Sequence, residues 1–166
     1  LTTNEQTRAL SMQIVSVKVS GPAAQEYWNQ PKDYAKFFPR KVPADAAGRR
    51  AYARELLGGF ARRAFRRPPE EATLNRLVNL AESIYTQPGK TFEAGVAQGM
   101  VAVLASPRFL FLEEHAEKSP GDGKYAFIDE YSLAARLSYL LWSSMPDDEL
   151  MRLAETGKLR ENLNAQ

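Results

Sequence analysis

The chain has 166 residues and a formal net charge of +2, with 44% hydrophobic and 25% charged residues. This length and composition predict one globular domain with a real core, with at most a fragment of a second domain. The absence of cysteine excludes disulfides, thiolate zinc sites, iron–sulfur clusters and covalent haem attachment from this chain. No apolar run approaches the roughly 20 residues of a membrane span, and no motif for reading nucleic acid accompanies the basic residues.

The N-terminal stretch gives the only β signal. Residues 12–20 read MQIVSVKVS, are rich in β-branched side chains and end at Gly21-Pro22. A lone strand cannot satisfy its backbone without a partner. We therefore interpret residues 1–22 as the strand remnant of a preceding β domain, and we expect a fragment of a longer protein. The alternative is that a second copy of the chain pairs with this strand and forms a homodimer.

Residues 23–44 contain Trp28, Tyr34, Phe37 and Phe38 among several prolines. This composition predicts an irregular connector that its aromatic side chains attach to the helices, with a short helix near residues 32–38. A sugar-stacking role for Tyr27, Trp28 and Tyr34 is the less favoured alternative.

Residues 45–114 have helical periodicity and form the first predicted helical module. A helix from an N-cap at Asp45 to Arg66 carries an apolar stripe, and Pro68-Pro69 stops it. Gly58-Gly59 weakens its middle, so we expect another helix to approach closely there. A second helix begins at Pro69. A third is capped by Thr91, has the close-packing pair Gly95 and Gly99, and is interrupted at Ser106-Pro107. The apolar run Phe109 to Leu112 is expected to be buried.

Residues 125–166 form a second, truncated module. Asp129 opens a helix that runs through Leu133, Leu137, Leu140 and Leu141 to Trp142. Ser144 is predicted as the next N-cap, with Asp147 at the third position of a capping box. Gly157 stops that helix, and residues 160–166 begin another. The chain as a whole therefore reads as mainly α, a bundle of about five helices with one N-terminal strand, in which residues 45–166 are the helical domain.

Four arginines, Arg62, Arg63, Arg66 and Arg67, stand at the end of the first long helix. They are candidates for binding an anion such as phosphate or an acidic glycan. The favoured alternative is that they complement the helix dipole and pair with nearby acids such as Glu55, Glu70 and Glu71.

Two more arginines, Arg108 and Arg136, lie in apolar segments. A buried charge needs a partner, so we expect at least one of them to be buried in an ion pair, with Asp147 among the candidate partners. The others are Glu113, Asp129 and Asp148.

The residues suited to catalysis or metal binding are sparse. The acidic run Asp147 to Glu149 is placed to cap a helix, and adjacent helical residues do not converge on one ion. His115 is the sole histidine and stands at the edge of a loop, where it cannot build a triad or a histidine-rich metal site. We therefore assign no catalytic, metal or cofactor-binding residue.

Three long motifs, RAFRRP, SPRFLF and RLSYLLWSSMPDDEL, together resemble an adjoining pair of bacterial domains of unknown function, over about residues 36–166. These are planctomycete-type domains of long exported proteins that also carry cytochrome c modules. The run IVSVKVSGP resembles the closing strand of a carbohydrate-binding-like β-sandwich that can precede them. Relatives often have cysteines near the positions of Phe38 and Ala51, so any bridge there is absent here.

The resemblance implies an exported protein, periplasmic or at the cell surface, with haem c elsewhere in the parent protein and its other domains as partners. We expect a non-catalytic structural and interaction module of such a protein. The alternative is part of an enzyme that acts on polysaccharide, with its site completed by other segments and a glycan as a partner. A third reading is an anion-binding module on the arginine helix. An exposed apolar patch would favour the first reading, convergent carboxylates in a cleft the second, and a bound anion the third.

Overall fold

The computed structural model describes residues 15–19, 30–117 and 125–163, and it divides into two units, residues 1–34 and 35–166. In the first unit, Val15 to Val19 belong to neither a helix nor a strand, and their three valines are exposed. The predicted strand is thus not formed over these residues, and the rest of residues 12–20 lies outside the described part. A strand needs a hydrogen-bonding neighbour, and none of the described residues supplies one to this segment. Its origin in a β domain stays a prediction.

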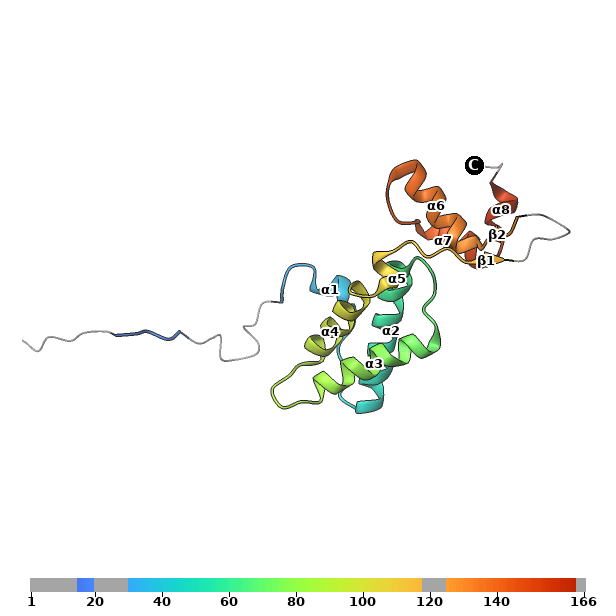
Figure 1. Cartoon of the computed structure of the whole chain (residues 1–166). Coiled ribbons are helices and arrows are strands. Elements are labelled where there is room, and N and C mark those ends of the chain that lie inside the picture. The colour runs from blue at the N-terminus through green and yellow to red at the C-terminus, as the bar shows by residue number, and fades with distance from the viewer. Residues whose placement is uncertain (1–14, 20–29, 118–124, 164–166) are drawn as a thin grey trace, which may run out of the picture. The chain divides into compact units, whose positions relative to one another are not determined.

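The second unit is mainly helical (Figure 1). The predicted connector helix is a single turn, α1 (Tyr34–Phe37). The first long helix is α2 (Ala46–Phe65), and the Asp45 side chain accepts a hydrogen bond from Gly48 N, as an N-cap should. It is followed by α3 (Glu71–Tyr85), which starts two residues later than predicted, and by α4 (Phe92–Leu104), capped by Thr91. Ser106 caps the single turn α5 (Pro107–Leu110).

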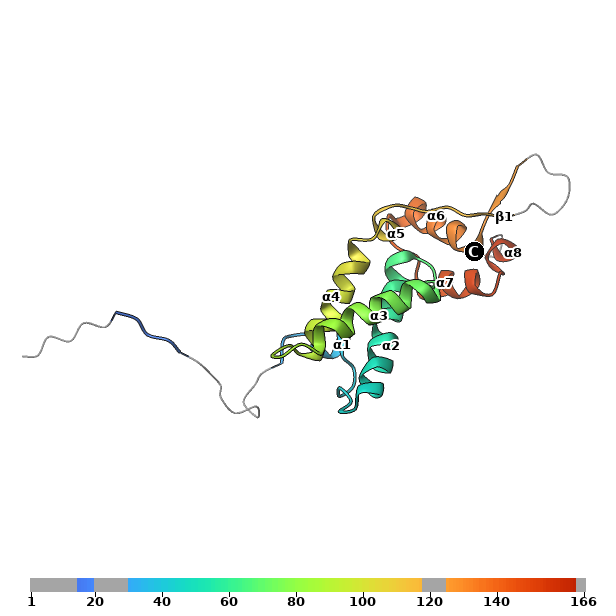
Figure 2. The same ribbon diagram turned by 60° about the horizontal axis from the view of Figure 1, so that its bottom comes forward.

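The core of this first module lies among α2, α3 and α4, which Figure 2 shows packed against one another. Phe92, at the start of α4, joins the three helices. Its ring stacks on Tyr52 of α2 at 5.6 Å between centroids and lies 5.4 Å from the ring of Tyr85 of α3. Burial of such large apolar rings is the main stabilising term for the module.

Close helix packing occurs at two glycines of α4, as predicted. A Cβ at Gly95 would lie 2.5 Å from the backbone oxygen of Ala81, and one at Gly99 would lie 2.7 Å from a methyl group of Leu57. The expectation of a close approach at Gly58-Gly59 is wrong for Gly59, because a Cβ there would meet nothing within 4 Å. The position faces an open surface instead.

The second module begins with a short antiparallel pair, β1 (Ala116–Glu117) and β2 (Phe127–Ile128). It continues with α6 (Glu130–Trp142), capped by Asp129, then α7 (Asp148–Glu155) and α8 (Leu159–Asn162). Its core is a separate apolar cluster that includes Ala134, Leu150, Leu153 and Leu159. Within the described residues, the five helices of eight residues or more match the predicted number, and single turns make up the rest.

Two predictions about exposure and capping are wrong. Leu110, Phe111 and Leu112 are more than half exposed, because the chain leaves the first module in an extended path after α5. On α6, Leu140 is 81% accessible, whereas small residues such as Ala134 and Ser138 are buried. Asp147, not Ser144, is the N-cap of α7, since its carboxylate accepts from Leu150 N at 2.8 Å. The stop at Gly157 is confirmed, with φ of +67°.

Candidate functional site

The arginines at the end of α2 connect the two helical modules. We call Arg62, Arg63, Arg66 and Arg67, with their partners after residue 128, the arginine joint. Arg67 donates to Asp129 Oδ2 at 2.8 Å and to Ser132 Oγ at 3.1 Å. The side chains of Arg67 and Asp129 are only 18% and 14% exposed, so their attraction is less screened by water than that of a surface pair.

Asp129 has a second role as the N-cap of α6, in which its carboxylate accepts from Ser132 N at 2.7 Å. Burial raises the pKa of Asp129, but hydrogen bonds from the side chain and backbone of Ser132, together with Arg67, outweigh burial and hold the pKa below 3.8. The carboxylate is therefore charged at neutral pH and fixes both the helix start and the joint.

The sole histidine completes this contact. Arg67 Nη1 lies 2.9 Å from His115 Nδ1, so that Nδ1 serves as the acceptor. The backbone N–H of His115 donates to Ser132 Oγ at 3.1 Å, and its carbonyl accepts from Asp129 N at 2.8 Å. His115 thus borders the joint, and its side chain is 53% exposed at the edge of a loop, as the sequence predicted.

The two arginines one turn earlier reach the following helix. Arg62 donates to Glu155 at the end of α7 at 2.7 Å. Arg63 lies 3.5 Å from Asp148 at the start of α7, but these side chains are 75% and 93% exposed, so the pair contributes little. The favoured reading of the arginines as ion-pairing residues fits this geometry, although their acids come from the second module rather than from Glu55, Glu70 and Glu71.

Arg66 is the arginine that is buried, with 7% of its surface exposed. Its Nη2 donates to the carbonyl oxygens of Arg108, Phe109 and Phe111 at 3.2, 3.1 and 2.9 Å, and its guanidinium lies 5.9 Å from the ring of Tyr139. It ends α2 with φ of +59°, a left-handed conformation that is uncommon for a residue with a side chain. Arg66 therefore closes the end of α5 and is occupied by backbone, which leaves it poorly placed for a free anion.

The expected buried ion pair is found at neither Arg108 nor Arg136. Arg108 is 33% exposed and contacts Thr73 and Glu70 at 2.7 and 3.2 Å, whereas Arg136 is 62% exposed and binds both oxygens of Glu114 at 2.5 and 2.8 Å. Neither Glu70 nor Glu114 was among the partners that the sequence suggested for these arginines. Asp147, which was, caps α7 instead. Because these partners are distant in sequence, their pairing could not be predicted from the spacing of residues along one helix.

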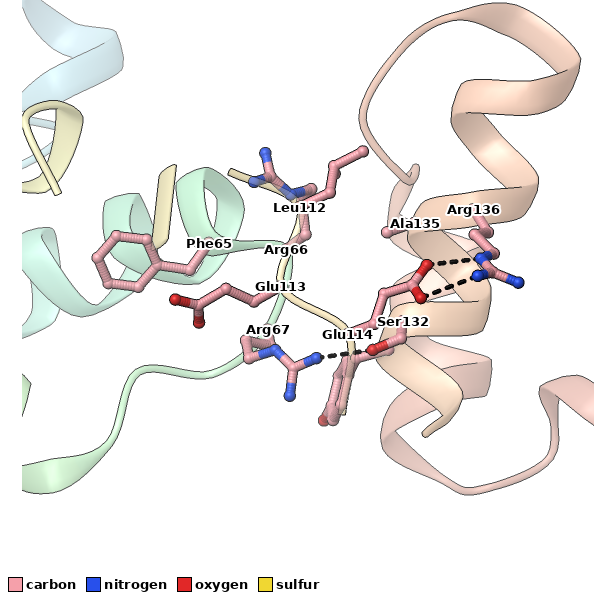
Figure 3. A pocket seen from close by; sticks show the side chains of 10 residues that line it. Phe65, Arg66, Arg67, Leu112, Glu113, Glu114, Ser132, Ala135 and Arg136 are labelled. Atoms are coloured by element: carbon pink, nitrogen blue, oxygen red, sulfur yellow. Dashed lines mark hydrogen bonds and ion pairs between the residues drawn. The ribbon is translucent and has the colours of Figure 1, made fainter. Parts of the chain in front are cut away.

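The joint lines a small, partly open pocket, shown in Figure 3, where Arg67 contacts Ser132 and Glu114 contacts Arg136. Its volume is about 20 Å³. A cavity of this size holds about one water molecule, so it is part of the contact between the modules and not a ligand site. Within the described residues, no three histidine, aspartate or glutamate side chains are grouped to hold a metal ion.

A much larger concavity lies on the exposed side of α2. We call it the apolar groove; its volume is about 590 Å³, in the range of binding sites. It runs between α2 and α4, and the lining is mostly apolar. The sequence did not reveal this site, although the six α2 residues that line it lie in three pairs about one helical turn apart. The lining residues are Lys36, Phe37, Pro39, Glu55, Leu56, Gly59, Phe60, Arg63, Ala64, Met100, Leu104, Phe109 and Met145.

Comparison with known families finds two matches. Residues 52–114 match the family described as Protein of unknown function (DUF1595), and residues 128–166 match the one described as Protein of unknown function (DUF1592). No curated protein and no solved structure matches the chain. Among the described residues, none of the helices is both long and apolar enough to cross a membrane. The arginine joint lies where the two matched regions meet, since Arg62 and Arg67 belong to the first and Asp129 and Glu155 to the second.

Proposed function

Because the chain carries two adjacent planctomycete-type domains of unknown function, we propose that it is a non-catalytic structural and interaction module of a larger exported bacterial protein linked to cytochrome c. The family resemblance supports export and the presence of haem c elsewhere in the parent protein. The other domains of that protein are then the partners.

The apolar groove is the observation that carries this proposal. Phe37, Leu104 and Met145 line it and are 49%, 42% and 45% exposed. Contiguous apolar surface that stays open to water is unfavourable unless a partner covers it, and it commonly marks an interaction site. The arginine joint supports the structural part of the proposal, since it uses the charges of α2 to hold the second module.

The test is site-specific photo-crosslinking in the complete parent protein. A photo-reactive amino acid at position 59 should form a crosslink to another domain of the same protein, which mass spectrometry identifies. The control is the same amino acid at Val101, which is 54% exposed on α4 and does not line the groove.

Two results would contradict the proposal. One is equal or absent crosslinking at both positions. The other is turnover of a soluble polysaccharide by the purified 166-residue chain, which would favour the enzymatic alternative.

A further inference from the structure

We propose that the apolar groove binds an acidic amphipathic helix of about ten residues. This inference rests on the proposed interaction role and names the chemistry of the partner segment. Its occupant is a helix that presents three apolar side chains to the groove and a carboxylate to Arg63.

The length of the occupant follows from α2. The groove extends along this helix from Glu55 to Ala64. At about 1.5 Å per residue, nine steps cover about 14 Å, or two and a half turns. A parallel or antiparallel helix of the same length places apolar side chains at positions i, i+4 and i+7 along that path.

The floor of the groove is shaped for close helix approach. Gly59 has open space where a Cβ would stand, so a ridge of the partner can approach the backbone of α2. Met100 and Met145 also line the groove, and their flexible side chains adapt to different apolar shapes. An apolar stripe of a partner helix therefore fits better than a rigid polar ligand.

The charge at the rim selects an acidic partner. Glu55 is bound by Arg40, which neutralises the one carboxylate among the lining residues. Arg63 is 75% exposed, and its contact with Asp148 at 3.5 Å is between two solvated side chains. The rim is therefore net positive, and complementary charge favours a carboxylate beside Arg63.

The experiment uses the 166-residue chain and a fluorescent helical peptide with leucine at i, i+4 and i+7 and glutamate on the flanks. The matched peptide has lysine in place of every glutamate. Fluorescence anisotropy should show that the glutamate peptide binds about tenfold more tightly, with a preference that decreases at high salt. Equal binding of the two peptides, or no binding, overturns the inference.

Three variants make the result specific. Gly59→Leu should weaken the glutamate peptide about tenfold because leucine fills the floor, whereas Val101→Glu should leave binding unchanged. Arg63→Glu should reverse the preference, so that the lysine peptide binds more tightly than the glutamate peptide. A folding defect would weaken both peptides and cannot produce this reversal.

Two other occupants are outcomes of the same measurements. If sedimentation shows a dimer that Gly59→Leu dissociates, a second copy of the chain occupies the groove, and the inference is wrong. It is also wrong if vesicles of phosphatidylglycerol and phosphatidylcholine bind the chain through the groove more tightly than the peptide does. Crosslinking at position 59 in the parent protein together with no peptide binding would preserve the interaction role and reject only the acidic helix.

Discussion

The guanidinium of Arg67, just after α2, binds Asp129, which is the N-cap of α6. The side chains of Arg67 and Asp129 are both mostly buried, and each neutralises the charge of the other. Removal of one partner leaves the other charge poorly solvated, which costs more than the intact pair contributes.

We therefore expect Asp129→Asn to lower the free energy of unfolding by about 2–3 kcal/mol, because it removes the charge partner of Arg67 while asparagine can still cap the helix. Urea denaturation measures this loss. The matched control is Glu55→Gln, which breaks a pair whose side chains are both more than half exposed and should change stability little. Equal effects of the two substitutions would contradict the role assigned to Asp129.

The same carboxylate gives the protein an acid-sensitive contact. Its pKa in the folded state lies below its ordinary value of 3.8, so its contribution to stability is complete above that pH and is lost as the pH falls through the folded-state pKa. The difference in unfolding free energy between the wild type and Asp129→Asn should therefore be constant near neutral pH and shrink below pH 3.8. Urea titrations from neutral to acidic pH test this, and a difference that grows on acidification would contradict it.

Single residues were predictable from the sequence where the chemistry is local. The caps at Asp45, Thr91 and Asp129 follow from residue type and position alone. The partners of Arg62 and Arg67 do not, because Glu155 and Asp129 are distant in sequence and only the fold brings them near. The arginines were recognised, but their role in joining two modules required the structure.

Among the helices, α3 and α4 pack so closely that the backbone of one limits the side chains of the other. The oxygen of Ala81 is fixed by its helix and cannot move away from position 95, whereas the Leu57 side chain near position 99 can rotate. The two glycines therefore differ in what an added methyl group costs.

We expect Gly95→Ala to be the more destabilising substitution, by about 2–3 kcal/mol, and Gly99→Ala to cost about 1 kcal/mol. Gly59→Ala should stabilise the protein by up to about 1 kcal/mol, since it meets no atom and improves helix propensity. Thermal denaturation of the three variants gives the order, and a stable Gly95→Ala protein would show that α3 and α4 are not this close.

The wrong prediction of burial concerns a whole segment rather than a cap. The run Phe109 to Leu112 is apolar on every side, so its pattern indicates burial. Periodicity shows which face of an element is apolar, but it does not show whether another element of the same chain covers that face. Within the described part of the chain, no element covers Leu110, Phe111 and Leu112, and these side chains stay more than half exposed.

Across the whole second unit, two apolar clusters form separately, one among α2, α3 and α4 and the other among α6, α7 and α8. Neither cluster contains a residue of the other module. The sequence predicted helical modules at residues 45–114 and 125–166, and the matched families cover residues 52–114 and 128–166. The N-terminal strand was not predictable in the same way, because its structure depends on a partner that the sequence cannot name.

The double variant Arg62→Ala/Arg67→Ala should therefore separate the unfolding of the two modules. Calorimetry should show a lower-temperature transition for the second module, whose smaller cluster depends more on the joint. The control Arg54→Ala breaks a contact with Glu71 inside the first module and should leave the transitions coupled. A single cooperative transition in the double variant would show that apolar contacts, not the arginines, join the modules.

Met145 has a consequence for how the molecule responds to any occupant. It follows α6, whereas the other residues that line the groove precede residue 110, so a bound segment touches both domains at once. Suppose that the intact Arg67–Asp129 contact raises the affinity of the groove for a segment by some factor. Thermodynamic reciprocity then requires that binding of the segment favours the intact contact by the same factor. The arginine joint and the apolar groove would in that case act as a single cooperative unit.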